Sequence, residues 1–240
     1  MHRVSRKVLV MIPAYNEEKT VGEIVESTLA LYPSFKVVVV DDGSDDLTAQ
    51  EAREAGADVV SLPFHCGGSI AIQTGYLVAA QQDYDCAVKI DADGQHKPEE
   101  IPKLLDPLVN DGVDMTVGSR YLTINNGNCS LVKEGGRVFS STLVSLLRKM
   151  EITDITSGMR AWSRKAIETL LPIYLERRFI EDSVFWVVET LLAYRNGLRM
   201  KEVPIEVLPR RCGRSKSYST SKLLVYPLRL ITTLLEQISG

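Results

Sequence analysis

Short apolar runs alternate with amphipathic stretches along the first half of the chain. The apolar runs predict buried strands at residues 7–12, 35–40, 58–62, 85–90 and 113–118. Stretches with apolar positions at helical spacing lie between them, at residues 20–31, 47–55, 67–82 and 98–109. This alternation predicts an α/β fold with an open, mainly parallel twisted sheet and helices on both faces.

The second half of the chain has a less regular pattern. It predicts helices at residues 136–150, 163–171 and 179–196. Residues 154–160 predict a turn or a short strand, and residues 199–207 alternate enough to predict a strand at a sheet edge. We expect one domain over residues 1–218. An amphipathic helix within residues 219–240 would pack on that domain, on a partner subunit or on the membrane surface.

Composition and charge narrow the class of protein. The chain has 240 residues and a formal net charge of −3, which gives no reason to expect nucleic acid as a partner. The 4 cysteines lie far apart without a CxxC pair, so the sequence favours a reduced, cytoplasmic setting. The sequence has no long uncharged apolar run, so we predict no transmembrane helix. Peripheral contact with the cytoplasmic membrane face and a homodimer are left open.

Two acidic residues follow the fourth apolar run. Asp91 and Asp93 are two positions apart, so an extended segment would point them to the same side. Carboxylate oxygens on one side suit Mg2+ or Mn2+, which commonly complete their ligand shell with phosphate oxygens. These residues therefore predict a metal–diphosphate site, and the alternative is a polar turn that only ends the strand.

Other polar residues follow the other predicted strands. Tyr15 and Glu17 come after the first strand, Asp42 after the second and Arg120 after the fifth. Ligands of open parallel sheets bind outside the carboxyl ends of the strands. Several strands thus bring acidic and phosphate-binding groups to one edge, which favours the metal–diphosphate site over the plain turn.

Several motifs occur in a characteristic order along nearly the whole chain. They are Ile12-Pro-Ala-Tyr-Asn-Glu-Glu18, Val40-Asp-Asp-Gly-Ser-Asp-Asp-Leu-Thr48, Asp91-Ala-Asp-Gly-Gln-His96, Gly118-Ser-Arg-Tyr121, Ser157-Gly-Met-Arg160, Glu202-Val-Pro204 and Arg210-Arg-Cys-Gly-Arg-Ser-Lys216. In this order the chain resembles family 2 glycosyltransferases, which have the Rossmann-like GT-A fold. The likeness is greatest to the polyprenol-phosphate (dolichol-phosphate) sugar synthases, including mannosyl synthases.

The resemblance implies a donor site for a nucleoside diphosphate-sugar. Its donor-binding residues would be Pro13, Tyr15, Glu17, Asp42, Asp91 and Ala92. An aromatic ring offers a face for packing and a carboxylate accepts from a base N–H, which agrees with a nucleoside pocket. Asp91, Asp93 and Gln95 would hold Mg2+ or Mn2+ or its waters, and the metal would neutralise charge on the leaving diphosphate.

The resemblance also implies residues that act on phosphate groups. Arg120, Arg137 and Ser141 match positions that meet the acceptor phosphate, and Arg binds phosphate oxygens bidentately. Arg210 and Lys216 match a mobile basic loop that closes over the diphosphate. The alternatives are an exposed helix charge for Arg137 and a solvated charge run for the loop.

Two segments depart from the family pattern. The family often has Asn-x-Gly-x-Gly-x-Ala after the third strand, where this chain has His65 for Asn and Ser69 for the second Gly. We interpret His65 as a hydrogen-bonding loop residue in preference to a general base. Asp182 is the candidate base if the acceptor is a sugar hydroxyl, because a hydroxyl needs deprotonation and a phosphate does not. Its alternative role is a charge at a helix start.

The predicted activity is metal-dependent transfer of a sugar to a polyprenyl phosphate, with inversion at the anomeric carbon. The alternative enzyme transfers to a sugar hydroxyl of a growing glycan, with Asp182 as base. A catalytically silent nucleotide-sugar-binding protein is the alternative from another class. A nucleotidyltransferase is disfavoured, because no Gly-rich phosphate loop with Lys or Arg follows the first strand.

Overall fold

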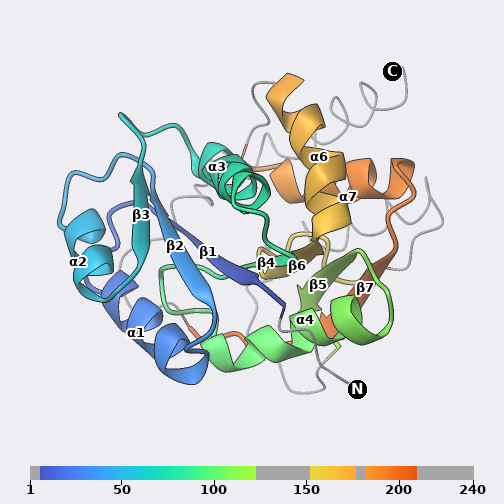
Figure 1. Ribbon diagram of the computed structural model, residues 1–240, viewed down its shortest axis with the longest axis horizontal. Helices are drawn as coiled ribbons and strands as arrows, with labels where there is room; N and C mark the ends of the chain where they lie inside the picture. Colours follow the sequence, from blue (N-terminus) through green and yellow to red (C-terminus); the bar gives the residue numbers. More distant parts are fainter. Residues whose placement is uncertain (1–5, 123–151, 177–181, 210–240) are drawn as a thin grey trace.

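A computed structural model describes residues 6–122, 152–176 and 182–209 of the chain. In these stretches seven strands form one sheet, in the order β3-β2-β1-β4-β6-β5-β7 (Figure 1). The strands are β1 (Val8–Ala14), β2 (Lys36–Asp41), β3 (Asp58–Ser61), β4 (Cys86–Lys89), β5 (Met115–Ser119), β6 (Arg160–Ser163) and β7 (Met200–Pro204).

Helices cover both faces of the sheet. They are α1 (Val21–Leu31), α2 (Thr48–Glu54), α3 (Gly68–Gln81), the 3-10 turn η1 (Pro98–Glu100), α4 (Ile101–Asn110), α6 (Arg164–Glu176) and α7 (Phe185–Arg195). Figure 1 shows α3, α6 and α7 on one side of the sheet and α1 and α4 on the other. The α/β fold class and the helices on both faces are therefore confirmed.

Strand β1 explains why the apolar runs are continuous. Val8, Val10 and Ile12 belong to the core cluster beneath α1 and α4, whereas Leu9 and Met11 belong to the cluster beneath α3 and α6. Successive side chains of a strand point to opposite faces, so a strand that is covered on both faces needs apolar residues at every position.

Strand β6 is the one described strand that runs against the others. β1 pairs in parallel with β2 and β4, and β5 pairs in parallel with β7. β6 lies antiparallel between β4 and β5. The sequence predicted a turn or a short strand at residues 154–160, and only Arg160 of that range belongs to β6. The strand was not located because four residues that begin with a charged arginine show no usable periodicity. The predicted edge position of residues 199–207 is confirmed by β7.

Several predicted features lie outside the described residues. They are Arg137, Ser141, Arg210, Lys216, the helix at residues 136–150 and the helix within residues 219–240. Within the described stretches, none of the helices has both the length and the apolar character needed to cross a bilayer.

Candidate active site

The loops after β1 and β2 are joined by hydrogen bonds at the carboxyl edge of the sheet. The Asp42 N–H donates to the Ala14 carbonyl at 2.8 Å. The Asn16 N–H donates to the Ser44 hydroxyl at 2.9 Å, and the Glu17 N–H donates to the Thr48 hydroxyl at 2.8 Å. These bonds hold the segment with Pro13, Tyr15 and Glu17 beside the segment with Asp42, as the sequence predicts for neighbouring parallel strands.

The loop after β3 adds His65 to this pair of segments. The His65 ring stacks on Tyr15, with ring centroids 3.8 Å apart and an interplanar angle of 10°. Its Nδ1 lies 2.8 Å from Asp42 Oδ2. The loop can approach because residue 43 is a glycine: φ there is +68°, and an added Cβ would lie 2.4 Å from the Phe64 carbonyl carbon.

Asp42 is a buried acceptor for the same loop. Its side chain is 3% exposed. Besides His65, the Cys66 N–H donates to Oδ1 at 2.7 Å and the Gly67 N–H donates to Oδ2 at 2.9 Å. A carboxylate has about four acceptor positions, so three donors are readily accommodated. Asp42 thus anchors the loop that carries His65.

The acidic pair Asp91 and Asp93 lies in a turn, not in an extended segment. β4 ends at Lys89, so the alternation of a strand does not reach these two residues and does not support the shared side that we expected. Gly94 has φ +76°, a conformation that favours glycine. The Gln95 N–H donates to Asp93 Oδ1 at 3.0 Å, which closes the turn.

Asp91 is flanked by two buried side chains. The Lys89 ammonium contacts Asp91 Oδ1, and the Lys89 side chain is only 4% exposed. The Asp91 N–H donates to Nδ1 of His96 at 3.0 Å. Burial lowers the pKa of His96 to about 4, with the Asp91 carboxylate opposing this effect. His96 is therefore neutral at pH 7, and its 3.2 Å approach to Asp91 Oδ2 is not an ion pair.

The donor set of this turn fits a hard divalent cation. The Gln95 side-chain nitrogen donates to the Leu208 carbonyl at 3.3 Å, so the amide oxygen is its atom for a metal. Asp91, Asp93 and Gln95 thus offer oxygen ligands, which Mg2+ and Mn2+ prefer. In the described residues no three His, Cys, Asp or Glu side chains form a metal cluster. A cation at this turn would complete its ligand shell with other oxygens, such as those of water or phosphate.

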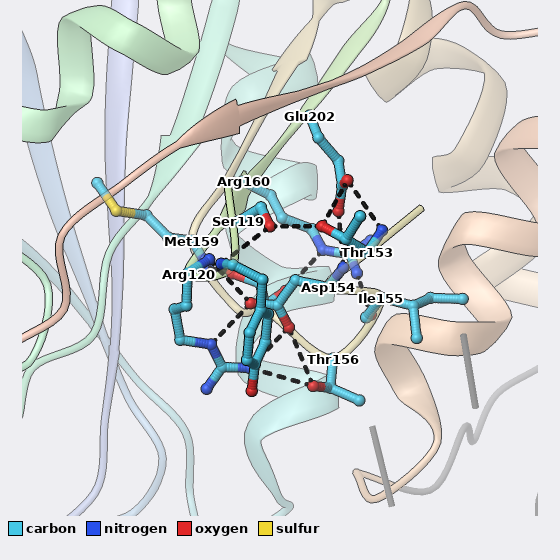
Figure 2. A network of polar contacts seen from close by, with 11 residues as sticks. Ser119, Arg120, Thr153, Asp154, Ile155, Thr156, Met159, Arg160 and Glu202 are labelled. Carbon is cyan, nitrogen blue, oxygen red and sulfur yellow. Dashed lines mark hydrogen bonds and ion pairs between the residues drawn. The ribbon is translucent and has the colours of Figure 1, made fainter. Parts of the chain in front are cut away.

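The segment before β6 ties the ends of β5 and β7 together. Arg120 donates from Nε to Asp154 Oδ2 and from Nη2 to Asp154 Oδ1, both at 2.7 Å. The Asp154 N–H donates to Glu202 Oε1 at 2.7 Å, and the Thr153 N–H donates to Oε2 at 2.9 Å. Ser119 and Thr153 share a hydroxyl contact of 2.7 Å. Figure 2 shows this network.

In this network Arg120, which we predicted to bind phosphate, already has a carboxylate partner. Its guanidinium is held bidentately by Asp154, which is fully buried. Arg120 keeps a 30% exposed side chain, so the pair orients it at the carboxyl edge. Sequence reasoning did not single out Asp154. The signal for it was an acidic residue in the otherwise uncharged segment just before Ser157-Gly-Met-Arg160.

Asp182 lies at the N-terminus of α3. The Gly68 and Ser69 N–H groups donate to its two carboxylate oxygens at 3.1 and 2.7 Å. Positive helix-end dipoles favour a carboxylate at this place. Asp182 and Asp42 together therefore satisfy four consecutive N–H groups of residues 66–69.

A buried ion pair lies next to the acidic turn. The side chains of Arg160 and Glu189 are both 0% exposed, and Arg160 Nη1 lies 3.0 Å from Glu189 Oε2. The Tyr76 and Tyr174 hydroxyls donate to Glu189 Oε1 at 2.7 and 3.1 Å. Burial raises the pKa of both tyrosines well above their usual value, so they remain donors.

Comparison with known proteins identifies the family. The model of glycosyl transferase family 2 matches residues 9–171. The chain belongs to glycosyl transferase family 2. A polyprenol monophosphomannose synthase of Mycolicibacterium smegmatis is 34% identical over 89% of this chain and 82% of its own length. A UDP-N-acetylglucosamine–dolichyl-phosphate N-acetylglucosaminyltransferase of Methanococcus voltae is 31% identical over 84% and 85%.

A solved structure confirms the fold of the family. Glucosyl-3-phosphoglycerate synthase from Mycobacterium tuberculosis, in complex with Mn2+, uridine diphosphate and phosphoglyceric acid, has a TM-score of 0.74 to this chain. The match covers 97% of this chain and 78% of that one, at 22% identity. The GT-A-like fold expected from the sequence motifs is thus confirmed, and the chain is a family 2 glycosyltransferase.

Proposed function

We propose that this family 2 glycosyltransferase transfers a sugar from a nucleoside diphosphate-sugar to a polyprenyl phosphate, with Mg2+ or Mn2+ in the site. The acceptor is supported by the names of the two relatives described above, a dolichyl-phosphate N-acetylglucosaminyltransferase and a polyprenol monophosphomannose synthase. The donor is supported by Tyr15, Asp42 and the Asp91–Asp93 turn, which follow the neighbouring parallel strands β1, β2 and β4 at one edge of the sheet.

Different residues would bind the donor, the cation and the acceptor. Tyr15 and Asp42 offer the nucleoside a ring face and a carboxylate, with Pro13 and Glu17 on the same loop. Asp91, Asp93 and Gln95 would hold the cation, which neutralises negative charge on the departing diphosphate. Arg120, oriented by Asp154, offers its guanidinium to the acceptor phosphate, with Arg137, Ser141, Arg210 and Lys216 as further candidates.

An acceptor phosphate oxygen then attacks the anomeric carbon as the bond to the diphosphate oxygen breaks. The electron pair of that bond leaves with the nucleoside diphosphate, and in-line attack inverts the anomeric centre. A phosphate is already ionised at neutral pH, so the step needs no protein base.

The alternative acceptor is a sugar hydroxyl, with Asp182 as base. Both Asp182 oxygens accept N–H groups from α3, and the carboxylate keeps about two further acceptor positions for a hydroxyl. The names of the relatives, and not this geometry, favour the phosphate acceptor.

Labelled sugar transfer tests the proposal. The full-length protein is incubated with UDP-, GDP- and dTDP-sugars labelled in the sugar, with either metal, and with a polyprenyl phosphate or an oligosaccharide. We expect label in the lipid phosphate. Label found only in the oligosaccharide would overturn the acceptor. Metal-dependent nucleotide binding without transfer to either acceptor would favour a catalytically silent nucleotide-sugar-binding protein.

Replacement of Asp93 tests the acidic turn. Asp93→Asn keeps the size of the side chain and removes a charged metal ligand, so turnover should fall on the order of 100-fold or more. Asp106→Asn, on the exposed side of α4, is the matched control and should keep full turnover. Equal activity of the two variants would contradict the metal assignment.

A further inference from the structure

The His65 side chain fills a place between two groups of the proposed nucleoside pocket. Its imidazole lies flat against Tyr15, with centroids 3.8 Å apart and planes at 10°. Its Nδ1 lies 2.8 Å from Asp42 Oδ2, a contact that is attractive when Nδ1 carries the ring proton, because a carboxylate only accepts. One planar ring thus uses both the face of Tyr15 and an oxygen of Asp42.

A nucleobase that binds these two groups would make the same pair of contacts. It would stack its ring on Tyr15 and donate a ring N–H to Asp42. Base–aromatic stacking and N–H···carboxylate bonds are the interactions by which planar heterocycles are held in protein sites. The imidazole and the base therefore compete for the same two groups.

We propose that His65 is a built-in substitute for the nucleobase and leaves this place when the donor nucleotide binds. The proposal rests on the proposed function, since it takes Tyr15 and Asp42 as nucleoside-binding groups. It also narrows the donor to bases with a ring N–H that can replace the imidazole N–H, which are uracil, thymine and guanine.

The exchange requires only a side-chain movement. Asp42 can keep the Cys66 and Gly67 N–H groups, because these are separate donors to its two oxygens. Asp182 holds the next two N–H groups, of Gly68 and Ser69. The backbone after His65 therefore stays fixed, while the His65 side chain, which is 51% exposed, can rotate into solvent.

This competition predicts opposite effects on stability and on binding. A protein whose site is occupied by its own side chain binds nucleotide with an affinity reduced by the fraction of molecules with an open site. His65→Ala should tighten nucleotide binding by about tenfold, given one stacking contact and one polar contact to displace. The same change should lower the melting temperature of the free protein, because the contacts are lost. If His65 had only a structural role, His65→Ala would lower both the melting temperature and the nucleotide affinity.

Calorimetry with full-length protein tests the proposal. The probes are UDP, GDP and dTDP with Mn2+, and inorganic pyrophosphate with Mn2+, which lacks a base. His65→Gln keeps a donor without a stacking ring and should tighten binding less than His65→Ala. Phe64→Ala is the matched control, because Phe64 is a 68% exposed ring on the same loop. We expect it to leave nucleotide affinity unchanged.

The outcomes separate the role of His65 from the proposed function. Tighter nucleotide binding by His65→Ala, with pyrophosphate binding unchanged, supports the proposal. Nucleotide binding that is equal to wild type or weaker overturns the role of His65 and leaves the proposed function standing. If none of the three nucleotides binds either protein, both the proposed donor and the role of His65 are wrong.

Discussion

Arg160 and Glu189 form an ion pair that is fully closed off from solvent. Arg160 donates further to the Thr190 hydroxyl at 2.9 Å and to the Ser157 carbonyl at 2.8 Å. Its guanidinium also lies 4.8 Å from the Trp186 ring centroid, and the Lys89 ammonium lies 5.1 Å from the same ring. Removing the partner of a buried charge is costly, because the charge that remains has no solvent to stabilise it.

Glu189→Gln should therefore lower the free energy of unfolding by about 3 kcal/mol. Urea unfolding monitored by circular dichroism measures this change. Glu168→Gln is the matched control, because Glu168 is 61% exposed and approaches Arg164 only at 4.0 Å. It should cost less than about 0.5 kcal/mol. A similar small loss for both variants would show that the buried pair adds little.

At this scale the sequence predicted where part of the candidate site lies in the fold. Tyr15, Asp42 and the Asp91–Asp93 turn were found because each directly follows an apolar strand whose position is easy to read. The contact of His65 with Tyr15 and Asp42 was not predictable, because it depends on how the loop after β3 passes over Gly43. The burial of Lys89 beside Asp91 was also not predicted, because a lysine at a strand end is usually exposed.

At the scale of elements, Asp154 connects strands that are remote in sequence. It pairs with Arg120 after β5, and its own N–H donates to Glu202 in β7. The short segment before β6 thus fixes the carboxyl ends of two strands where we place the acceptor phosphate. The sequence showed the flanking strands and helices, but it did not show this connection, since side chains from three separate segments create it.

Asp154→Asn should reduce stability by about 2 kcal/mol, less than a fully buried pair because Arg120 is partly exposed. It should also weaken the apparent affinity for the proposed lipid-phosphate acceptor and leave nucleotide affinity unchanged. Steady-state kinetics and calorimetry distinguish these effects. Asp83→Asn removes an exposed partner of Arg164 and is the control. A loss of nucleotide affinity with Asp154→Asn would contradict the assignment of Arg120 and Asp154 to acceptor binding alone.

At the scale of the whole molecule, ligand binding should stabilise the native sheet. The proposed donor site combines loops from β1, β2, β3 and β4, so a bound nucleotide and metal would hold all four together. A ligand at 100 times its dissociation constant contributes about 2.7 kcal/mol. For a chain of this size that corresponds to a rise of about 5–10 °C in melting temperature.

Thermal unfolding with the matching nucleoside diphosphate and Mn2+ measures this rise. EDTA should remove most of it, because the diphosphate oxygens and the acidic turn would then lack their shared cation. The Asp93→Asn protein should show little rise with or without EDTA. A rise in wild type that is insensitive to EDTA would mean that the nucleotide binds without the metal.

The antiparallel strand β6 has a consequence for how the chain folds. It fills the gap between β4 and β5, where Val88 pairs with Ala161 and Thr116 pairs with Ala161 from the other side. During synthesis, the residues of β4 and β5 are made before those of β6. Until β6 is added, the edges of β4 and β5 that pair with it have unpaired backbone groups. Such edges invite pairing with other chains. The late strand therefore joins two parts of the sheet, and an interrupted chain that lacks it should aggregate.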